Sequence, residues 1–157
     1  ADLSGKTEKI NTILENSHSI SEENVLYYDS SEKMGDLTGI SVEQRSQSGV
    51  ILTLKLQYEK GAVTVKTEYN IRKILGCLVE KIVYADGSEN DEVSMLPSAF
   101  CAVEKQEDGS YILRGGGYGH GLGMSQNGAN GMAKAGMTCE EILQSFYQNV
   151  EIKEASE

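Results

Sequence analysis

The strongest constraint on the fold is a run of alternating apolar and polar residues between Ile40 and Val65. Two turn sequences, Gln47–Gly49 and Glu59–Gly61, interrupt it. A period of two places the apolar side chains on one face of a strand, and short turns join antiparallel neighbours. The sequence therefore predicts an antiparallel meander with one buried face. Its apolar positions are Ile40, Val42, Val50, Leu52, Leu54, Leu56, Val63 and Val65.

Helices and a hairpin surround this meander. Helical spacing over residues 3–14 and 68–75 predicts two early helices, the second ending at Gly76, and a short strand is expected at 25–28. The pair Asp108-Gly109 predicts a hairpin between strands at 99–104 and 111–113. Two further helices are expected near the C-terminus, at 125–135 and after the capping box that Thr138 opens. The fold class is therefore α+β, with antiparallel hairpins and a few short helices in a single domain over residues 1–157.

The charge balance excludes two classes of partner. The formal net charge is −10 and the pI is about 4.7, and such an acidic surface repels nucleic acid and anionic membranes. No apolar run approaches the roughly 18 residues that span a bilayer. Cys77, Cys101 and Cys139 lack metal-binding spacing, so we expect three buried, unreactive cysteines and no zinc site.

Residues 115–126 read GGGYGHGLGMSQ, with one of the two histidines of the chain among six glycines. From any starting glycine the third position of GxGxxG falls on another residue, and no GK[ST] follows, so this is not a phosphate-binding loop. Alternate glycines favour an extended segment with one bare side. Tyr118 and His120 would project from the other side into a groove, and Ser125 and Gln126 would add a hydroxyl and an amide.

A second interpretation of the glycines stays open at this point. They would permit tight packing at a sheet corner, with His120 a buried and fully hydrogen-bonded histidine. On the same grounds Arg72 and Lys73 form a solvated helix face. Within the first long helix after the glycines, Gly128 and Gly131 each cost about 1 kcal/mol relative to alanine, which indicates close approach of another element.

The stretch GGGYGHGLGMSQNGANGMAKAGMTCEEILQSFYQNVEI, residues 115–152, resembles the closing signature of the stage II sporulation protein D family, which includes the amidase-enhancer proteins. Weaker similarity precedes it in the same order, at VTVKTEYNIRKILG and LPSAF. The chain departs from the family pattern at four positions: Gly116 and Tyr118 replace a common arginine and tryptophan, and Cys139 and Gln148 a common tyrosine and proline.

The resemblance implies work on the bacterial cell wall outside the cytoplasm. Sporulation members of the family resemble lytic transglycosylases, which cut the glycan strand of peptidoglycan and leave a 1,6-anhydro sugar. The resemblance implies that the glycan is held by Tyr118, Gly119, Gly121, Ser125, Gln126 and Arg72, with His120 as an auxiliary catalytic residue.

The catalytic acid that the family uses is missing from these residues. The nearest carboxylates, Glu107, Asp108, Glu140 and Glu141, belong to a turn or a helix start. In the family the catalytic glutamate and any cysteine and histidine zinc ligands lie upstream. The chain therefore resembles the C-terminal, substrate-groove half of a membrane-anchored or secreted protein, inactive alone and without a cofactor of its own.

Two alternatives to this half-enzyme remain open. The chain is either a non-catalytic cell-wall module that enhances a separate amidase or acts with other sporulation proteins, or a plain structural domain whose glycines only build the fold.

Overall fold

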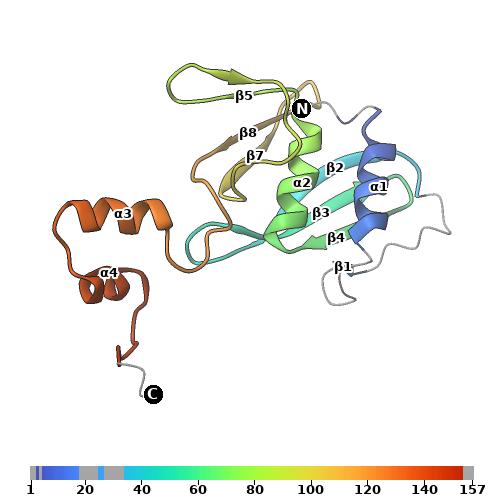
Figure 1. Cartoon of the computed structure of the whole chain (residues 1–157). Coiled ribbons are helices and arrows are strands. Elements are labelled where there is room, and N and C mark those ends of the chain that lie inside the picture. The colour runs from blue at the N-terminus through green and yellow to red at the C-terminus, as the bar shows by residue number, and fades with distance from the viewer. Residues whose placement is uncertain (1–2, 4, 18–24, 27–33, 154–157) are drawn as a thin grey trace. The chain divides into compact units, whose positions relative to one another are not determined.

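The computed structural model describes residues 3, 5–17, 25–26 and 34–153. The chain forms two compact units, Ala1–Gly121 and Leu122–Glu157. A single domain over residues 1–157 stays a prediction. The mixture of antiparallel strands and helices confirms the α+β class (Figure 1).

The predicted meander forms the main sheet of the first unit. Strands β2 (Leu37–Arg45), β3 (Ile51–Tyr58) and β4 (Gly61–Lys66) pair in antiparallel order. The short β1 (Val25–Leu26) pairs with β4, which completes the order β1-β4-β3-β2. The strand expected at 25–28 is thus present at its first two residues, and the other two lie outside the described residues.

The prediction of the buried face is wrong at one position. Leu54, Leu56, Val63 and Val65 are fully buried, but Leu52 is 40% exposed while its neighbour Ile51 is buried. The register between β2 and β3 shifts on both sides of Gln44. Such an irregularity inserts an extra residue and exchanges the faces of the strand beyond it, so the alternation of β3 changes phase before Leu54.

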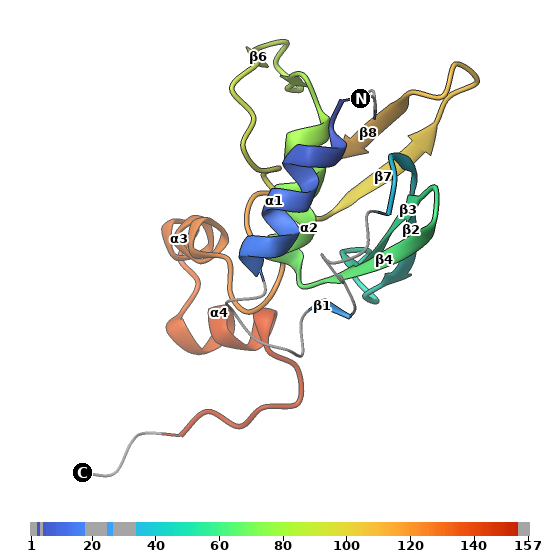
Figure 2. The same ribbon diagram turned by 90° about the vertical axis from the view of Figure 1, so that its right-hand side faces the viewer.

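Two helices cover the sheet. Helix α1 (Thr7–Ser17) packs beside α2 (Glu68–Leu78), and α2 packs on β3 and β4 (Figure 2). The expected apolar face of α1 is confirmed, because Ile10 and Leu14 are buried in the single core cluster. The helix begins at Thr7, and the Thr7 hydroxyl accepts a hydrogen bond from the backbone of Leu37 at 3.1 Å.

Helix α2 does not end at Gly76, as the sequence predicted, but runs on to Leu78. Glycine stands there because another segment crosses the helix closely. A Cβ atom at Gly76 would lie 2.6 Å from the Cα atom of Met95 and 2.9 Å from the backbone nitrogen of Leu96. The missing side chain therefore admits the backbone of residues 95–96 rather than terminating the helix.

The predicted hairpin is confirmed as β7 (Cys101–Lys105) and β8 (Tyr111–Gly115). It is tied to the main sheet from two directions: the Tyr111 hydroxyl accepts from the backbone of Ile40 at 3.2 Å, and the Arg45 guanidinium donates to the Cys101 carbonyl at 2.8 Å. A second short hairpin, β5 (Ile82–Val83) with β6 (Glu89–Asn90), forms an arm before it.

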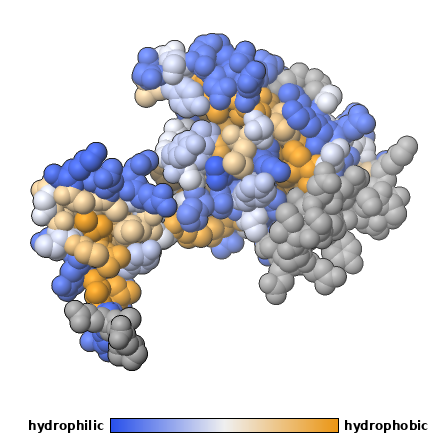
Figure 3. Space-filling model, viewed as in Figure 1, coloured by the Kyte–Doolittle hydropathy of each residue, from blue (hydrophilic) through white to orange (hydrophobic). Residues whose placement is uncertain are grey.

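The second unit contains the two expected C-terminal helices, α3 (Gln126–Lys134) and α4 (Cys139–Phe146). Close approach explains Gly128, since a Cβ atom there would lie 3.2 Å from the Phe146 ring, but not Gly131, which has nothing within 4 Å. Ile142 is the one buried residue in the described part of this unit. Figure 3 shows apolar residues over α4 and the segment after it.

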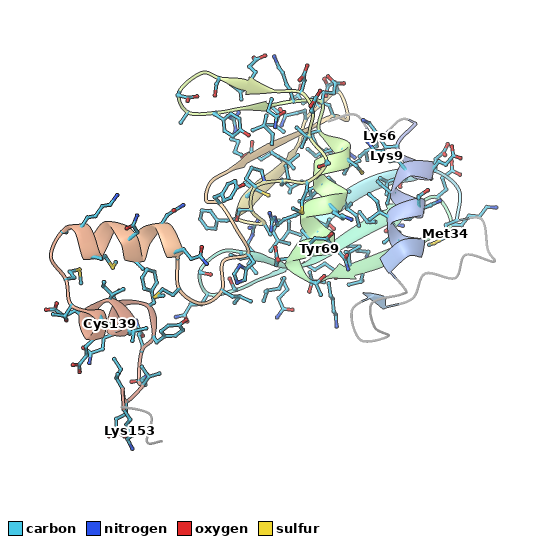
Figure 4. The ribbon with its side chains drawn as sticks, viewed as in Figure 1. Lys6, Lys9, Met34, Tyr69, Cys139 and Lys153 are labelled. Carbon is cyan, nitrogen blue, oxygen red and sulfur yellow. The ribbon has the colours of Figure 1, made fainter. Side chains whose placement is uncertain are left out.

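The cysteines divide between the two units. Cys77 and Cys101 are buried as predicted, and burial raises the pKa of both thiols, which disfavours the reactive thiolate. The prediction is wrong for Cys139, which is exposed at the first residue of α4 (Figure 4). No helix in the described ranges is long and apolar enough to cross a membrane.

The capping box predicted at Thr138 is confirmed, and it makes the stability of α4 depend on pH. The Glu141 carboxylate accepts from the Thr138 backbone at 2.8 Å and from its hydroxyl at 2.9 Å, and these bonds lower the pKa of Glu141 below its ordinary value of 4.5. A lowered folded-state pKa contributes stability that is complete above pH 4.5 and is lost as the pH falls through the lowered value.

We therefore expect the helicity of α4 to fall on acidification below pH 4.5, measured by amide exchange or circular dichroism. Replacing Glu141 with glutamine removes the titrating group and should remove this part of the pH dependence. The idea fails if Glu141→Gln and the unmodified chain lose α4 in parallel over the same pH range.

Candidate functional site

The segment between β8 and α3 is not the extended strand that the alternating glycines predicted. Gly117, Gly119, Gly121 and Gly123 have φ values of +79°, +113°, +77° and +71°. These angles lie in the left-handed region that residues with a side chain rarely adopt. The backbone therefore turns at every second residue, and the side chains between the glycines do not line up as on a strand. Residues 116–121, in the first unit, are called the glycine loop below.

The glycine loop is held against the segment Leu96–Phe100. The backbone nitrogen of Gly119 donates to the Pro97 carbonyl at 2.9 Å, and that of Gly116 donates to the Phe100 carbonyl at 3.0 Å. A Cβ atom at Gly121 would lie 2.9 Å from a methyl carbon of Val50, so the end of the loop rests on the residue that precedes β3. Backbone hydrogen bonds and close packing thus fix a loop that contains few side chains.

Arg72 supports the segment on which the loop rests. Its Nε donates to the Leu96 carbonyl at 2.8 Å, its guanidinium pairs with Glu68 at 3.1 Å, and the Leu96 backbone donates to the Arg72 carbonyl at 3.0 Å. The side chain is only 12% exposed, so a solvated helix face is the wrong description for Arg72. The structure gives this residue a positioning role, and a contact with substrate stays a prediction.

The two side chains that the loop presents are both exposed. Tyr118 is 94% exposed, and His120 is exposed as well. In the described part of the chain neither side chain has a hydrogen bond or an ion pair. The alternative of a buried, satisfied His120 is therefore wrong, and both side chains are accessible to a ligand.

Ser125 and Gln126 belong to the second unit. The Ser125 side chain accepts from the Gly128 backbone at 3.0 Å and so caps α3, whose first residue is Gln126. Capping accounts for the serine without a ligand. Binding of a substrate by Ser125 and Gln126 together with Tyr118 stays a prediction.

An open groove of about 1020 Å³ lies beside the loop, within the first unit. It is lined by residues 79–85 of the arm, by 96–98, 100 and 101, and by 111–118. Three exposed or half-exposed aromatic side chains border it: Tyr84, Phe100 and Tyr118. Figure 3 shows polar residues on the outer side of the arm and apolar residues beneath it. The sequence left residues 77–97 ambiguous, with one possible strand before an acidic loop, because strands of two residues have no measurable periodicity.

Residues 6–123 match the family described as "Domain of unknown function (DUF8618)". The chain belongs to this family. The match covers most of the first unit, including the whole glycine loop. No solved structure matches the chain significantly.

Curated relatives of this DUF8618 chain match over shorter stretches. The stage II sporulation protein D of Bacillus subtilis (strain 168) is 56% identical over 39 residues, which are 25% of this chain and 11% of that protein. The protein of the same name from Bacillus amyloliquefaciens is 45% identical over 51 residues, 32% and 15% of the two chains. The amidase enhancer of Bacillus subtilis (strain 168) is 41% identical over 54 residues, 34% and 8%. The resemblance drawn from the signature is thus confirmed for parts of the chain, which span well under a fifth of these three relatives.

Two carboxylates that flank the signature in sequence are held in their ionised form in this DUF8618 chain. Hydrogen bonds from Ser110 lower the pKa of Asp108, and those from Thr138 lower the pKa of Glu141. A general acid for glycosidic cleavage needs a raised pKa instead, so that it holds its proton near neutral pH. Among the described residues no group of three histidine, cysteine, aspartate or glutamate side chains could hold a metal ion.

Proposed function

We propose that the chain is the glycan-binding part of a cell-wall protein. The observation that carries this proposal is Tyr118, an aromatic side chain that is 94% exposed on a loop whose backbone is fixed. An exposed aromatic ring contributes nothing to a core, and a fixed loop loses little conformational entropy when a ligand binds. The names of the relatives, stage II sporulation protein D and amidase enhancer, support cell-wall work.

The chemistry of the glycine loop suits a saccharide. A sugar ring stacks through its C–H groups on an aromatic face such as that of Tyr118. The backbone of Gly117 and Gly119 has no side chain above it and can approach hydroxyl and acetamido groups closely. The imidazole of His120 offers one donor and one acceptor when neutral. Gly121 and Arg72 contribute by holding the loop in place.

The finer proposal is that the parent protein is a lytic transglycosylase. An acid outside these 157 residues would protonate the glycosidic oxygen, which leaves as a hydroxyl group while the C6 hydroxyl of the sugar attacks the anomeric carbon. The same group or a neighbour, acting as a base, would take the proton of the C6 hydroxyl. In this scheme Tyr118 and the loop hold the glycan, and His120 orients the acid or the sugar. Any zinc would be bound by residues outside the chain, and the site would work on the extracytoplasmic side of the envelope.

A second function is a binding module that enhances a separate amidase. The relative named amidase enhancer supports this alternative. In both functions the ligand of the glycine loop is the glycan strand of peptidoglycan.

Sedimentation of the chain with isolated cell-wall sacculi tests the shared part of the proposal. We expect binding that peptide-free glycan strands compete away and that cellulose fragments do not. Mass spectrometry should find no anhydro-sugar product from the chain alone, whereas stimulation of an added amidase would favour the enhancer. If the chain stays in the supernatant, or if cellulose competes equally well, glycan binding is wrong.

A further inference from the structure

One buried side chain in the lining of the groove has a hydrogen-bond donor to spare. Ser98 is 9% exposed, and its hydroxyl oxygen accepts from the backbone nitrogen of Phe100 at 3.1 Å. A hydroxyl also carries one proton to donate, and within the described ranges no residue accepts it. A buried polar group that keeps an unused donor costs free energy, so this proton is available to an occupant of the groove.

The glycine loop leaves this hydroxyl uncovered. A Cβ atom at Gly117 would lie 3.6 Å from the Oγ atom of Ser98, so a larger residue there would place its side chain beside the hydroxyl. Both residues line the groove, and so does Tyr118, the next residue of the loop. The surface on which the glycine loop would hold a sugar is therefore continuous with the groove, inside the first unit.

Two further aromatic side chains in the groove are anchored at their base. Phe100 is 48% exposed, and its ring is so close to the turn before β3 that a Cβ atom at Gly49 would lie 2.7 Å from it. Tyr84 is 41% exposed on the arm, whose residues Val79 and Ile82 pack against the core. Anchored rings lose little conformational entropy when a ligand binds, and aromatic faces suit the C–H groups of a sugar.

The charges in the groove are balanced, which favours a neutral occupant. Lys81 pairs with Glu89 at 2.7 Å, and Arg114 pairs with Glu104 at 3.5 Å. Glu80 adds a further carboxylate to the lining of a groove in a chain whose net charge is −10. An anionic ligand would gain no net attraction from such a surface. The groove therefore suits an uncharged ligand that combines apolar groups with a hydrogen-bond acceptor.

We propose that the groove is a second sugar subsite, which takes an N-acetylated sugar of the same glycan strand. The acetamido carbonyl would accept the hydrogen bond that the Ser98 hydroxyl has to spare, and the acetamido methyl and the sugar ring would contact Phe100 and Tyr84. The acetamido group is neutral and offers both an acceptor and an apolar methyl. This inference rests on the proposed function, in which a neighbouring sugar stacks on Tyr118, and it makes Ser98 and Tyr84 residues that determine specificity.

Titration of the chain with short oligosaccharides, followed by NMR, tests the subsite. The probes are β-1,4-linked N-acetylglucosamine oligomers of one to four sugars, and glucose oligomers of the same linkage and lengths. We expect affinity for the N-acetylated series to rise at least fivefold between one and four sugars, because only the longer oligomers reach both Tyr118 and the groove. The N-acetylated tetrasaccharide should bind at least fivefold more tightly than the glucose tetrasaccharide and shift the amide signal of Phe100, which is bonded to Ser98.

Two sets of variants separate specificity from folding. Ser98→Ala should reduce the preference for the N-acetylated tetrasaccharide at least threefold, whereas a general loss of structure would weaken both sugars alike. Tyr84→Ala should lower affinity for the N-acetylated tetrasaccharide at least threefold, and Tyr84→Phe, which keeps the ring, should not. Tyr84 is exposed, so its two variants still decide the matter where Ser98→Ala does not fold.

The outcomes distinguish this subsite from the proposed function. Binding that Tyr118→Ala weakens but that Ser98→Ala and Tyr84→Ala leave unchanged would overturn the groove subsite alone. Equal binding of the N-acetylated and glucose tetrasaccharides by the unmodified chain would overturn recognition of the acetamido group. If no N-acetylated oligomer binds, glycan recognition by the chain is wrong, and the subsite with it.

Discussion

Replacing Gly76 with alanine is expected to destabilise the first unit by about 2 kcal/mol, although alanine is the better helix former. The helix propensity of alanine would contribute about 1 kcal/mol in the opposite direction. The new methyl group, however, would lie 2.6 Å from the Met95 Cα atom, and overpacking against a backbone costs about 1–3 kcal/mol or more. We expect the midpoint of thermal unfolding to fall by roughly 8 °C.

Gly131→Ala is the matched control for this substitution. Gly131 also stands inside a helix, but a Cβ atom there would meet nothing within 4 Å. We therefore expect about 1 kcal/mol of stabilisation, seen as slower amide exchange in α3. If both alanines stabilise their helices, the close crossing at Gly76 is not a constraint and the account of α2 is wrong.

Replacing Gly121 with alanine is expected to detach the glycine loop from its support. Alanine at φ +77° costs about 1–2 kcal/mol, and its Cβ atom would lie 2.9 Å from a methyl carbon of Val50, which is stiff because it is β-branched. The strained φ angle and the collision with Val50 should together weaken the attachment of the loop by about 2–3 kcal/mol. Because the loop can separate without unfolding the core, the Gly119 amide should exchange faster as its bond to Pro97 opens.

Gly119→Ala separates the cost of the positive φ angle from the cost of the collision with Val50. Gly119 also has a positive φ, but a Cβ atom there would meet nothing within 4 Å, so we expect only the conformational cost. Val50→Ala combined with Gly121→Ala should recover part of the loss, since the double variant lacks the colliding methyl group. Equal costs at the two glycines, with no recovery in the double variant, would show that packing on Val50 does not hold the loop.

Regular periodicity predicted most of the fold. The meander, the Asp108-Gly109 hairpin and the Thr138 cap were found where their residues indicated them. These features are determined by residues that are close together along the chain, so one sequence is enough to predict them. The phase of β3 could not be predicted, because the register shift beside Gln44 arises from pairing with another strand and exposes Leu52.

Glycine was the residue most often misinterpreted. Gly76 resembled a helix end, and the alternate glycines resembled a strand with one bare side. In both cases the reason lies in the backbone: a segment crosses Gly76, and positive φ angles turn the loop. Sequence alone cannot separate these uses, because close approach, turning and helix termination all favour the same residue.

The structure connects three motifs that lie apart in the sequence: helix α2, the segment Leu96–Phe100 and the glycine loop. Arg72 and Gly76 of α2 hold residues 95–96, and the segment Leu96–Phe100 holds the glycine loop. The sequence predicted Tyr118 and His120 as exposed site residues, and the structure places both side chains in solvent, but Arg72 was first interpreted as a solvated residue. The sequence did not single out Tyr84 and left the arm ambiguous, because little in a two-residue strand distinguishes it from a loop.

Binding of Tyr118→Ala to cell-wall sacculi tests the central claim most directly. Because Tyr118 is 94% exposed, its loss should leave the free energy of unfolding within about 0.5 kcal/mol of that of the unmodified chain. It should reduce the affinity for sacculi at least tenfold, which corresponds to about 1.4 kcal/mol of binding free energy. Tyr69→Ala, which removes an exposed tyrosine of α2 outside the groove (Figure 4), should leave binding unchanged. Equal binding by Tyr118→Ala and the unmodified chain would contradict glycan recognition by the glycine loop.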